Sequence, residues 1–351
     1  MLLFPKRSMG ILAVLAAIEL LHAGYGNRIA VSSERVAEPP LVYGPLVAAT
    51  GEANRDGLPR PRMLALGDAK PPRTVPPPNM PGFWGVEDLG AYNPLPKRRM
   101  EDFFLALEPN AEGKHSVVFG GGGAGVQGLF DPRSLDHPLL DLLGVDWILA
   151  SKPVSHASLT DRTSTSSPGQ ARLYERSGAM PRATFLDRSR CITDRDRRLA
   201  VLASVERDPR TEVLLESTDA PEFDGDRIVD AEVSVVEHRD ERVVVRVVNR
   251  EPGILRLADP YDAGWVAHDE VSGEDLPVYV ADHYLRAVAL EPGEHRVVFR
   301  YAALSVRAPA WIGGLGLLLA IAAIVLSRPR RAVGEVERAG EAGSPGPAGS
   351  L

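Results

Sequence analysis

The sequence has almost none of the residues that mark disulfide frameworks and zinc sites. Its 351 residues include one cysteine, Cys191. A single cysteine cannot form an internal disulfide, and it matches none of the spaced Cys/His patterns of a zinc site. The chain is mildly acidic, with a formal net charge of −7, and it lacks a Lys/Arg-rich stripe with interleaved aromatic residues. Nucleic acid is therefore not an expected partner.

Common enzyme signatures are also missing. The histidines are scattered, without an HExxH motif, and no G-x-S-x-G elbow occurs. The adjacent pair Asp282-His283 would point to opposite faces of a strand. Gly123 to Gly128 matches G-x-G-x-x-G, but the next expected helix begins at Pro132, too late to bring its N-terminus to a pyrophosphate. The sequence therefore predicts no catalytic residue, no cofactor and no metal site.

Long hydrophobic runs occur only near the two ends. From Trp311 to Leu326 every residue is apolar or glycine. Residues 308–327 therefore suffice for a helix that crosses ~30 Å of hydrocarbon. Arg328, Arg330 and Arg331 follow, and arginines gather on the cytoplasmic side. We expect a transmembrane helix over residues 308–327 and a disordered cytoplasmic tail over residues 328–351, which are rich in Gly, Pro, Ala and Glu.

The N-terminal segment, residues 1–27, allows two interpretations. Lys6 and Arg7 precede an apolar run that Glu19 interrupts. A signal peptide has this basic start and short apolar stretch. The alternative is a transmembrane helix, which we favour because an intramembrane carboxylate usually faces other helices or a water-filled cavity. With that helix, both termini are cytoplasmic and the protein lies in the cell membrane with two segments. The bulk of the chain is extracytoplasmic by either route.

The exterior region is expected to be α+β, with an α/β domain over residues 28–210. Residues 28–60 suggest an extended, loop-rich start, and Glu87-Asp88 suggests a solvated loop. Arg62–Leu66 and Val145–Ala150 are typical of strands. A helix is expected within residues 94–107. Another should run from Asp131, as its N-cap, to Gly144.

Short strands with turn residues between them predict an antiparallel β-sandwich over residues 211–305. The strands recur at roughly ten-residue spacing, which is typical of that architecture. In the last of them, apolar and polar residues alternate as a half-buried strand requires. The expected strands are Val233–Val236, Arg242–Val248, Ile254–Ala258, Pro277–Ala281, Tyr284–Leu290 and His295–Tyr301.

Three groups of short motifs resemble those of the YfhO family of bacterial multi-span membrane proteins. The first combines Pro78-Asn79 with residues 85–95 (GVEDLGAYNPL). The second combines residues 139–149 (LLDLLGVDWIL) with residues 180–183 (MPRA). The third combines residues 259–265 (DPYDAGW) with residues 286–288 (RAV) and residues 292–297 (PGEHRV). Their order and spacing across nearly the whole chain carry the resemblance. Ala91 and Ala263 depart from the family pattern at turns.

This resemblance implies an exterior module of a protein similar to type C glycosyltransferases, which have many transmembrane helices. The chain matches only the last part of the family's length, so no catalytic residue carries over. Implied partners are the membrane, a multi-span membrane protein and a lipid-linked sugar or glycan. Tyr92 and Trp265 are candidate glycan contacts, since aromatic rings stack on sugars. The alternative is a membrane-tethered extracytoplasmic binding or structural domain without enzymatic activity.

Overall fold

The computed structural model describes residues 39–56, 58–67, 80–90, 98–109, 128–163, 171–225 and 231–302. The predicted segments over residues 1–27, 308–327 and 328–351 lie outside these ranges, as do Tyr92 and residues 120–127 of the glycine-rich run. The chain separates into two units at Tyr301, and everything below concerns the first. Within the described ranges, no helix has both the length and the apolar character that crossing a membrane requires.

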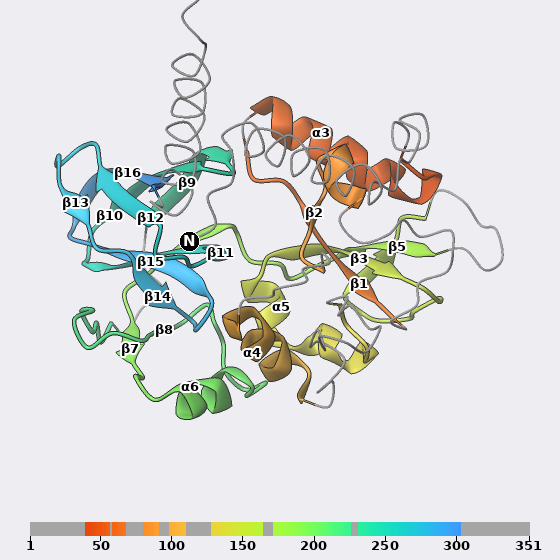
Figure 1. The fold of residues 1–351 in the computed structure, drawn as a ribbon, viewed down its shortest axis with the longest axis horizontal. Helices are drawn as coiled ribbons and strands as arrows, with labels where there is room; N and C mark the ends of the chain where they lie inside the picture. Colours follow the sequence, from red (N-terminus) through yellow and green to blue (C-terminus); the bar gives the residue numbers. More distant parts are fainter. Residues whose placement is uncertain are drawn as a thin grey trace, which may run out of the picture. The chain divides into compact units, whose positions relative to one another are not determined.

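The described fold is mixed α+β, with strands grouped in three sheets (Figure 1). The helical elements are the 3-10 helices η1 (Leu41–Tyr43), η2 (Met80–Trp84) and η4 (Pro132–Asp136), and the α-helices α3 (Gly44–Asp56), α4 (Arg98–Leu107), α5 (Pro138–Leu142) and α6 (Arg195–Leu202). The strands before residue 220 are β1 (Arg62–Leu66), β2 (Glu87–Asp88), β3 (Val145–Ala150), β4 (Leu159–Asp161), β5 (Arg172–Arg176), β6 (Ala183–Leu186), β7 (Ser189–Cys191) and β8 (Val213–Leu215). The later strands are β9 (Glu232–Arg239), β10 (Arg242–Asn249), β11 (Gly253–Pro260), β12 (Trp265–Asp269), β13 (Asp275–Leu276), β14 (Tyr279–Ala281), β15 (Leu285–Leu290) and β16 (Gly293–Tyr301).

The first sheet has the order β2-β1-β3-β5-β4, and helices cover both of its faces. Strands β2, β1 and β3 run parallel, and β5 and β4 are antiparallel additions. Successive residues of β3 enter different cores. Trp147 and Leu149 pack in a core with Leu46 of α3, whereas Ile148 packs in a core with Phe103 of α4. Burial on both faces explains why β3 is apolar at every position from Trp147 to Ala150.

The second sheet (β13-β12-β16-β10-β9) and the third sheet (β6-β11-β15-β14-β8-β7) share one hydrophobic core. Val245 and Phe299 enter this core from the second sheet, and Leu255 and Val288 enter it from the third. All pairings in these sheets are antiparallel except β7 with β8. The third sheet takes strands from both sides of residue 210. The domain division at that residue stays a prediction.

The strands expected within the described residues all occur, with shifts at their ends, whereas a strand expected over residues 115–119 lies outside those residues. Arg62–Leu66 and Val145–Ala150 are strands with the expected bounds, and the six strands expected after residue 211 correspond to β9, β10, β11, β14, β15 and β16. Period-2 alternation and apolar runs bounded by turn residues are strong local signals, so strands can be predicted from them without knowledge of the tertiary fold.

Two predictions for helical segments were wrong. Residues 44–56 form the helix α3 instead of an extended segment. Pro45 does not prevent this helix, because it lies in the first turn, where proline costs no hydrogen bond. The helix expected from Asp131 to Gly144 is two short helices. Asp131 does cap the first, and Gly144 adopts φ +64° just after the second. Between them His137 is extended, as the residue before Pro138 is biased to be.

Candidate functional site

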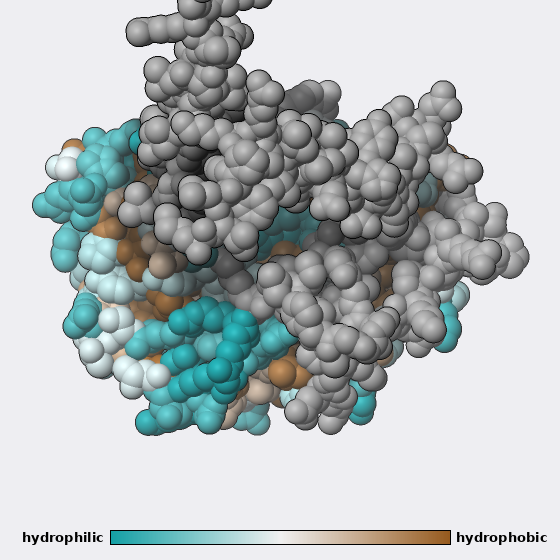
Figure 2. Space-filling view, viewed as in Figure 1, coloured by the Kyte–Doolittle hydropathy of each residue, from teal (hydrophilic) through white to brown (hydrophobic). Residues whose placement is uncertain are grey.

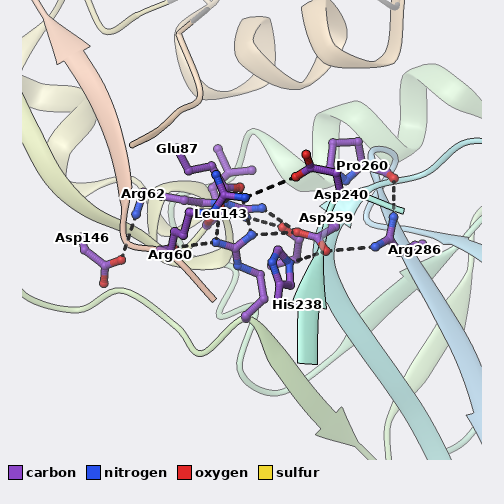
Figure 3. A network of polar contacts seen from close by, with 12 residues as sticks. Arg60, Arg62, Glu87, Leu143, Asp146, His238, Asp240, Asp259, Pro260 and Arg286 are labelled. Atoms are coloured by element: carbon purple, nitrogen blue, oxygen red, sulfur yellow. Dashed lines mark hydrogen bonds and ion pairs between the residues drawn. The ribbon is translucent and has the colours of Figure 1, made fainter. Parts of the chain in front are cut away.

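Asp259, near the end of β11, is the centre of a buried polar network between the first and third sheets (Figure 3). Its Oδ1 accepts hydrogen bonds from Arg62 Nη2 at 2.6 Å and from Arg182 Nη1 at 2.8 Å. Its Oδ2 accepts one from Arg286 Nη2 at 3.0 Å and lies 3.1 Å from His238 Nε2. The carboxylate side chain is only 8% exposed. Four nitrogen-bearing side chains therefore converge on one buried acid.

Glu87, at the start of β2, is the second acid of this network. Its Oε1 accepts from Arg62 Nε at 2.7 Å, and both of its oxygens accept from Arg182 at 2.8–2.9 Å. Arg62 also donates to the carbonyl oxygens of Leu143, at 2.9 Å, and of Ala258. The two arginines therefore bridge β1 and β2 of the first sheet to β11 of the third.

The electrostatics of the network favour the charged forms. Burial opposes ionisation of Glu87, but the charges of Arg62 and Arg182 outweigh it and lower the pKa of Glu87 to about 2. Burial likewise opposes ionisation of Asp259, yet the hydrogen bond from His238 and the arginine charges hold its pKa well below the usual range. Burial lowers the pKa of Arg286 to about 10, so it too stays charged at neutral pH.

The shifted pKa of Glu87 predicts an acid-dependent loss of stability. The pKa of Glu87 is about 2 in the folded protein and 4.5 in the unfolded chain. Ionised Glu87 therefore stabilises the fold above about pH 4.5, and this contribution disappears as the pH falls towards 2. We expect it to amount to as much as about 3 kcal/mol of unfolding free energy. Urea unfolding of the wild type and of Glu87→Gln between pH 5 and 2 measures it. If the free energy of unfolding falls with pH equally in the wild type and in Glu87→Gln, the prediction is contradicted.

Of the two aromatic residues predicted from the sequence, the structure describes Trp265, at the start of β12. The guanidinium carbon of Arg286 lies 3.7 Å from the centroid of its ring, and the Tyr301 ring meets it edge-on at 5.3 Å. Arg286 thus connects Trp265 to the Asp259 network. Since the arginine occupies one face of the indole, a sugar would have to stack on the other. Glycan contact by Trp265 and Tyr92 stays a prediction.

A second buried centre lies at the turn between β14 and β15. Asp282 and His283 adopt φ angles of +47° and +68°, the left-handed region that few residues other than glycine enter. The strand placement assumed for this pair was wrong. Asp282 is fully buried, and its carboxylate accepts from Arg256 at 2.9 Å, from Arg207 at 2.6 Å and from the backbone of Leu214 at 3.1 Å. These contacts hold the strained turn in place.

His283 extends this centre towards α4 and α6. Its Nε2 lies 3.1 Å from Asp102 Oδ2, and its Nδ1 lies 3.2 Å from Glu216 Oε1. Arg198 of α6 also pairs with Glu216, at 3.0 Å. Burial opposes ionisation of Glu216, but the hydrogen bonds from His283 and Arg99 lower its pKa to about 2. The imidazole is thus clamped between two carboxylates, an arrangement that fixes its orientation.

The described residues contain no group of three or more His, Cys, Asp and Glu side chains placed to hold a metal ion. The two buried centres consist of arginines, carboxylates and histidine whose donors and acceptors largely satisfy one another. Buried polar networks whose members are satisfied make the fold rigid and specify one packing of the core. Sequence reasoning missed both centres, although it singled out the stretches that contain Glu87, Arg182, Asp259 and Arg286.

Comparisons with known proteins identify no relative: no family model, curated protein or solved structure matches the chain.

Proposed function

We propose that the chain is the exterior module of a YfhO-like, glycosyltransferase-like membrane protein involved in processing cell-envelope glycans or lipid-linked sugars. It carries no complete catalytic bundle of its own and serves as a rigid accessory body. Its finer architecture is then an exterior α/β half followed by an antiparallel β-sandwich, with a membrane segment at each end. The common core of the second and third sheets supports the sandwich part of this proposal.

The observation that carries the proposal is that the three groups of family-like motifs contribute side chains to the same buried network. The first group contains Glu87, the second contains Arg182, and the third contains Asp259 and Arg286. Motifs separated by up to two hundred residues of sequence contribute these side chains to one hydrogen-bonded network. Chance similarity in short apolar stretches would not select side chains that contact one another. The convergence therefore favours a fold shared with the YfhO family, in which the motifs supply the hydrogen bonds that hold the sheets together.

The topology of this proposal predicts that the described body lies outside the cytoplasm and both ends lie inside. The reason is that basic residues precede the first apolar segment and follow the second. A cysteine introduced at Ser166, in a Cys191→Ala background, should react with a membrane-impermeant maleimide on intact cells. One introduced at Ser344 should react only after permeabilisation. The reverse pattern would contradict the topology and, with it, the proposed function.

A second candidate function is that of a membrane-tethered binding or structural domain that acts alone. A cavity of about 590 Å³ favours it. Its wall combines apolar side chains, among them Phe130 and Val205, with the buried Glu108 and His137. That volume falls in the range of small-molecule sites. Genomic DNA upstream of Met1 separates the two candidates. A neighbouring same-strand frame with many hydrophobic spans supports the first, and unrelated neighbours support the second.

A further inference from the structure

An open hollow of about 640 Å³ lies between β7, α6 and the loop that leads to β8. It is lined by acidic, hydroxyl and small apolar residues and by four arginines, Arg188, Arg190, Arg197 and Arg207. Figure 2 shows hydrophilic residues gathered in the lower part of the view, where Figure 1 draws α6. The hollow is distinct from both buried centres, although Arg207 reaches Asp282 from its wall.

The fold directs several guanidinium groups into this hollow. Arg188 and Arg190 are two residues apart along an extended segment, so their side chains leave the same face of it. Arg197 comes from α6, whose residues Ala200 and Val201 also line the hollow. The side chains of Arg188 and Arg190 are 49% and 47% exposed, which leaves their nitrogens accessible to a ligand from solvent.

Within the described residues, Glu212 is the only acid that forms an ion pair with any of these three arginines. Arg190 Nη2 lies 2.9 Å from its Oε2, and Arg188 Nε lies 3.7 Å from its Oε1. The second distance exceeds that of a normal hydrogen bond, so Arg188 keeps its donors largely unused. Arg197 has no ion pair with any described residue. The Glu212 carboxylate therefore uses only part of the hydrogen-bond donors of the three arginines, and the remaining donors can bind a second anion.

The other charges on the wall are one arginine and two carboxylates. Arg207 pairs with the buried Asp282 at 2.6 Å. Asp208 accepts a hydrogen bond from the backbone N–H of Arg210 at 2.9 Å and lies 3.7 Å from its guanidinium group, and Glu206 is the other carboxylate. The hydroxyl of Ser204 accepts a hydrogen bond from the Glu206 backbone and still has its hydrogen to donate. Positive charge and hydrogen-bond donors therefore exceed acceptors at the Arg188–Arg190–Arg197 side.

We propose that this hollow is a binding site for the phosphate group of a ligand, held by Arg188, Arg190 and Arg197. Guanidinium groups present planar donor pairs that match phosphate oxygens, and the charge-assisted bonds they form are strong. Glu212 anchors two of the arginines in the absence of ligand and, as an anion at the same place, weakens phosphate binding. The inference does not depend on the membrane topology, because it follows from the described side chains alone.

The test is phosphate binding to the purified full chain, measured by calorimetry with inorganic phosphate and pyrophosphate at constant ionic strength set with chloride. Arg190→Gln and Arg197→Gln should each weaken binding roughly tenfold, since each removes a charge-assisted hydrogen bond. Glu212→Gln should strengthen binding, because it removes the competing negative charge. Arg246→Gln removes a comparably exposed arginine from β10 and should leave binding unchanged.

The opposite responses of the arginine and glutamate variants separate a binding site from a purely structural cluster. A structural cluster would lose stability in all three variants and show no phosphate dependence. Absence of saturable phosphate binding, or weaker binding in Glu212→Gln with an unchanged circular dichroism spectrum, overturns the proposal. Soluble short-chain phosphatidic acid identifies the source of the phosphate. Tighter binding than inorganic phosphate indicates a lipid headgroup, and equal binding indicates a water-soluble ligand.

Discussion

Asp259→Asn is expected to lower the free energy of unfolding by about 3–5 kcal/mol, the usual effect of removing one partner from a buried ion pair. Asparagine has the same shape, so the packing is kept and only the charge is lost. Arg286, almost fully buried, then loses the acid that compensates it, and the equally buried Arg62 keeps only Glu87. The asparagine NH₂ group would also face donors, since nitrogens approach Asp259 from both sides.

The matched control for this change is Asp240→Asn. Asp240 also pairs with an arginine, Arg60 at 3.3 Å, but its side chain is 92% exposed. Exposed pairs contribute up to about 1 kcal/mol, so the control should change stability little. Urea unfolding of the full chain, followed by tryptophan fluorescence, compares the two. Equal effects of Asp259→Asn and Asp240→Asn would show that the network does not stabilise the fold. If Asp259→Asn fails to fold, Glu87→Gln provides the comparison, because that carboxylate is 27% exposed.

The Asp259 network shows where prediction from the sequence ended. The strand over Arg62–Leu66 was predicted with its bounds, because its apolar residues give a local signal. Nothing local shows that Arg62 would be buried, since its two acids lie 25 and 197 residues away in the sequence. Glu87 was predicted to be a solvated loop residue for the same reason. Burial of a charge depends on partners supplied by the tertiary fold, and sequence periodicity does not identify those partners.

The turn at Asp282 and His283 was missed because its residues are not the usual ones. Hairpin turns with two consecutive positive φ angles normally use Asn-Gly or Asp-Gly, where glycine avoids strain. In this turn, where Ala281 pairs with Leu285, histidine is the second such residue, at φ +68°. The sequence signal for a turn was therefore only half present. The backbone strain of this turn is offset by polar contacts with residues of α4, α6 and β11. These contacts cannot be recognised in the local sequence.

Asp282→Asn tests how this strained turn is held. Asparagine also tolerates the left-handed region, so the backbone cost of the turn stays nearly constant and the variant isolates the charge. Arg256 is buried at 1% exposure and pairs with Asp282 at 2.9 Å. Without that acid, the buried guanidinium group would lose its carboxylate partner and keep only neutral acceptors. We expect Asp282→Asn to cost about 3 kcal/mol or more of unfolding free energy.

A double-mutant cycle with Arg256→Gln shows whether that cost arises from the ion pair. Arg256→Gln alone should also destabilise, because Arg256 additionally donates to the Pro209 carbonyl at 2.9 Å. The two changes together should cost about 1–3 kcal/mol less than their sum, since the second removes the charge that the first left unpaired. Additive effects would mean that Arg207, which also contacts Asp282, satisfies it without Arg256. In that case the turn is held from the loop before β8, and a cycle of Asp282→Asn with Arg207→Gln should show the coupling instead.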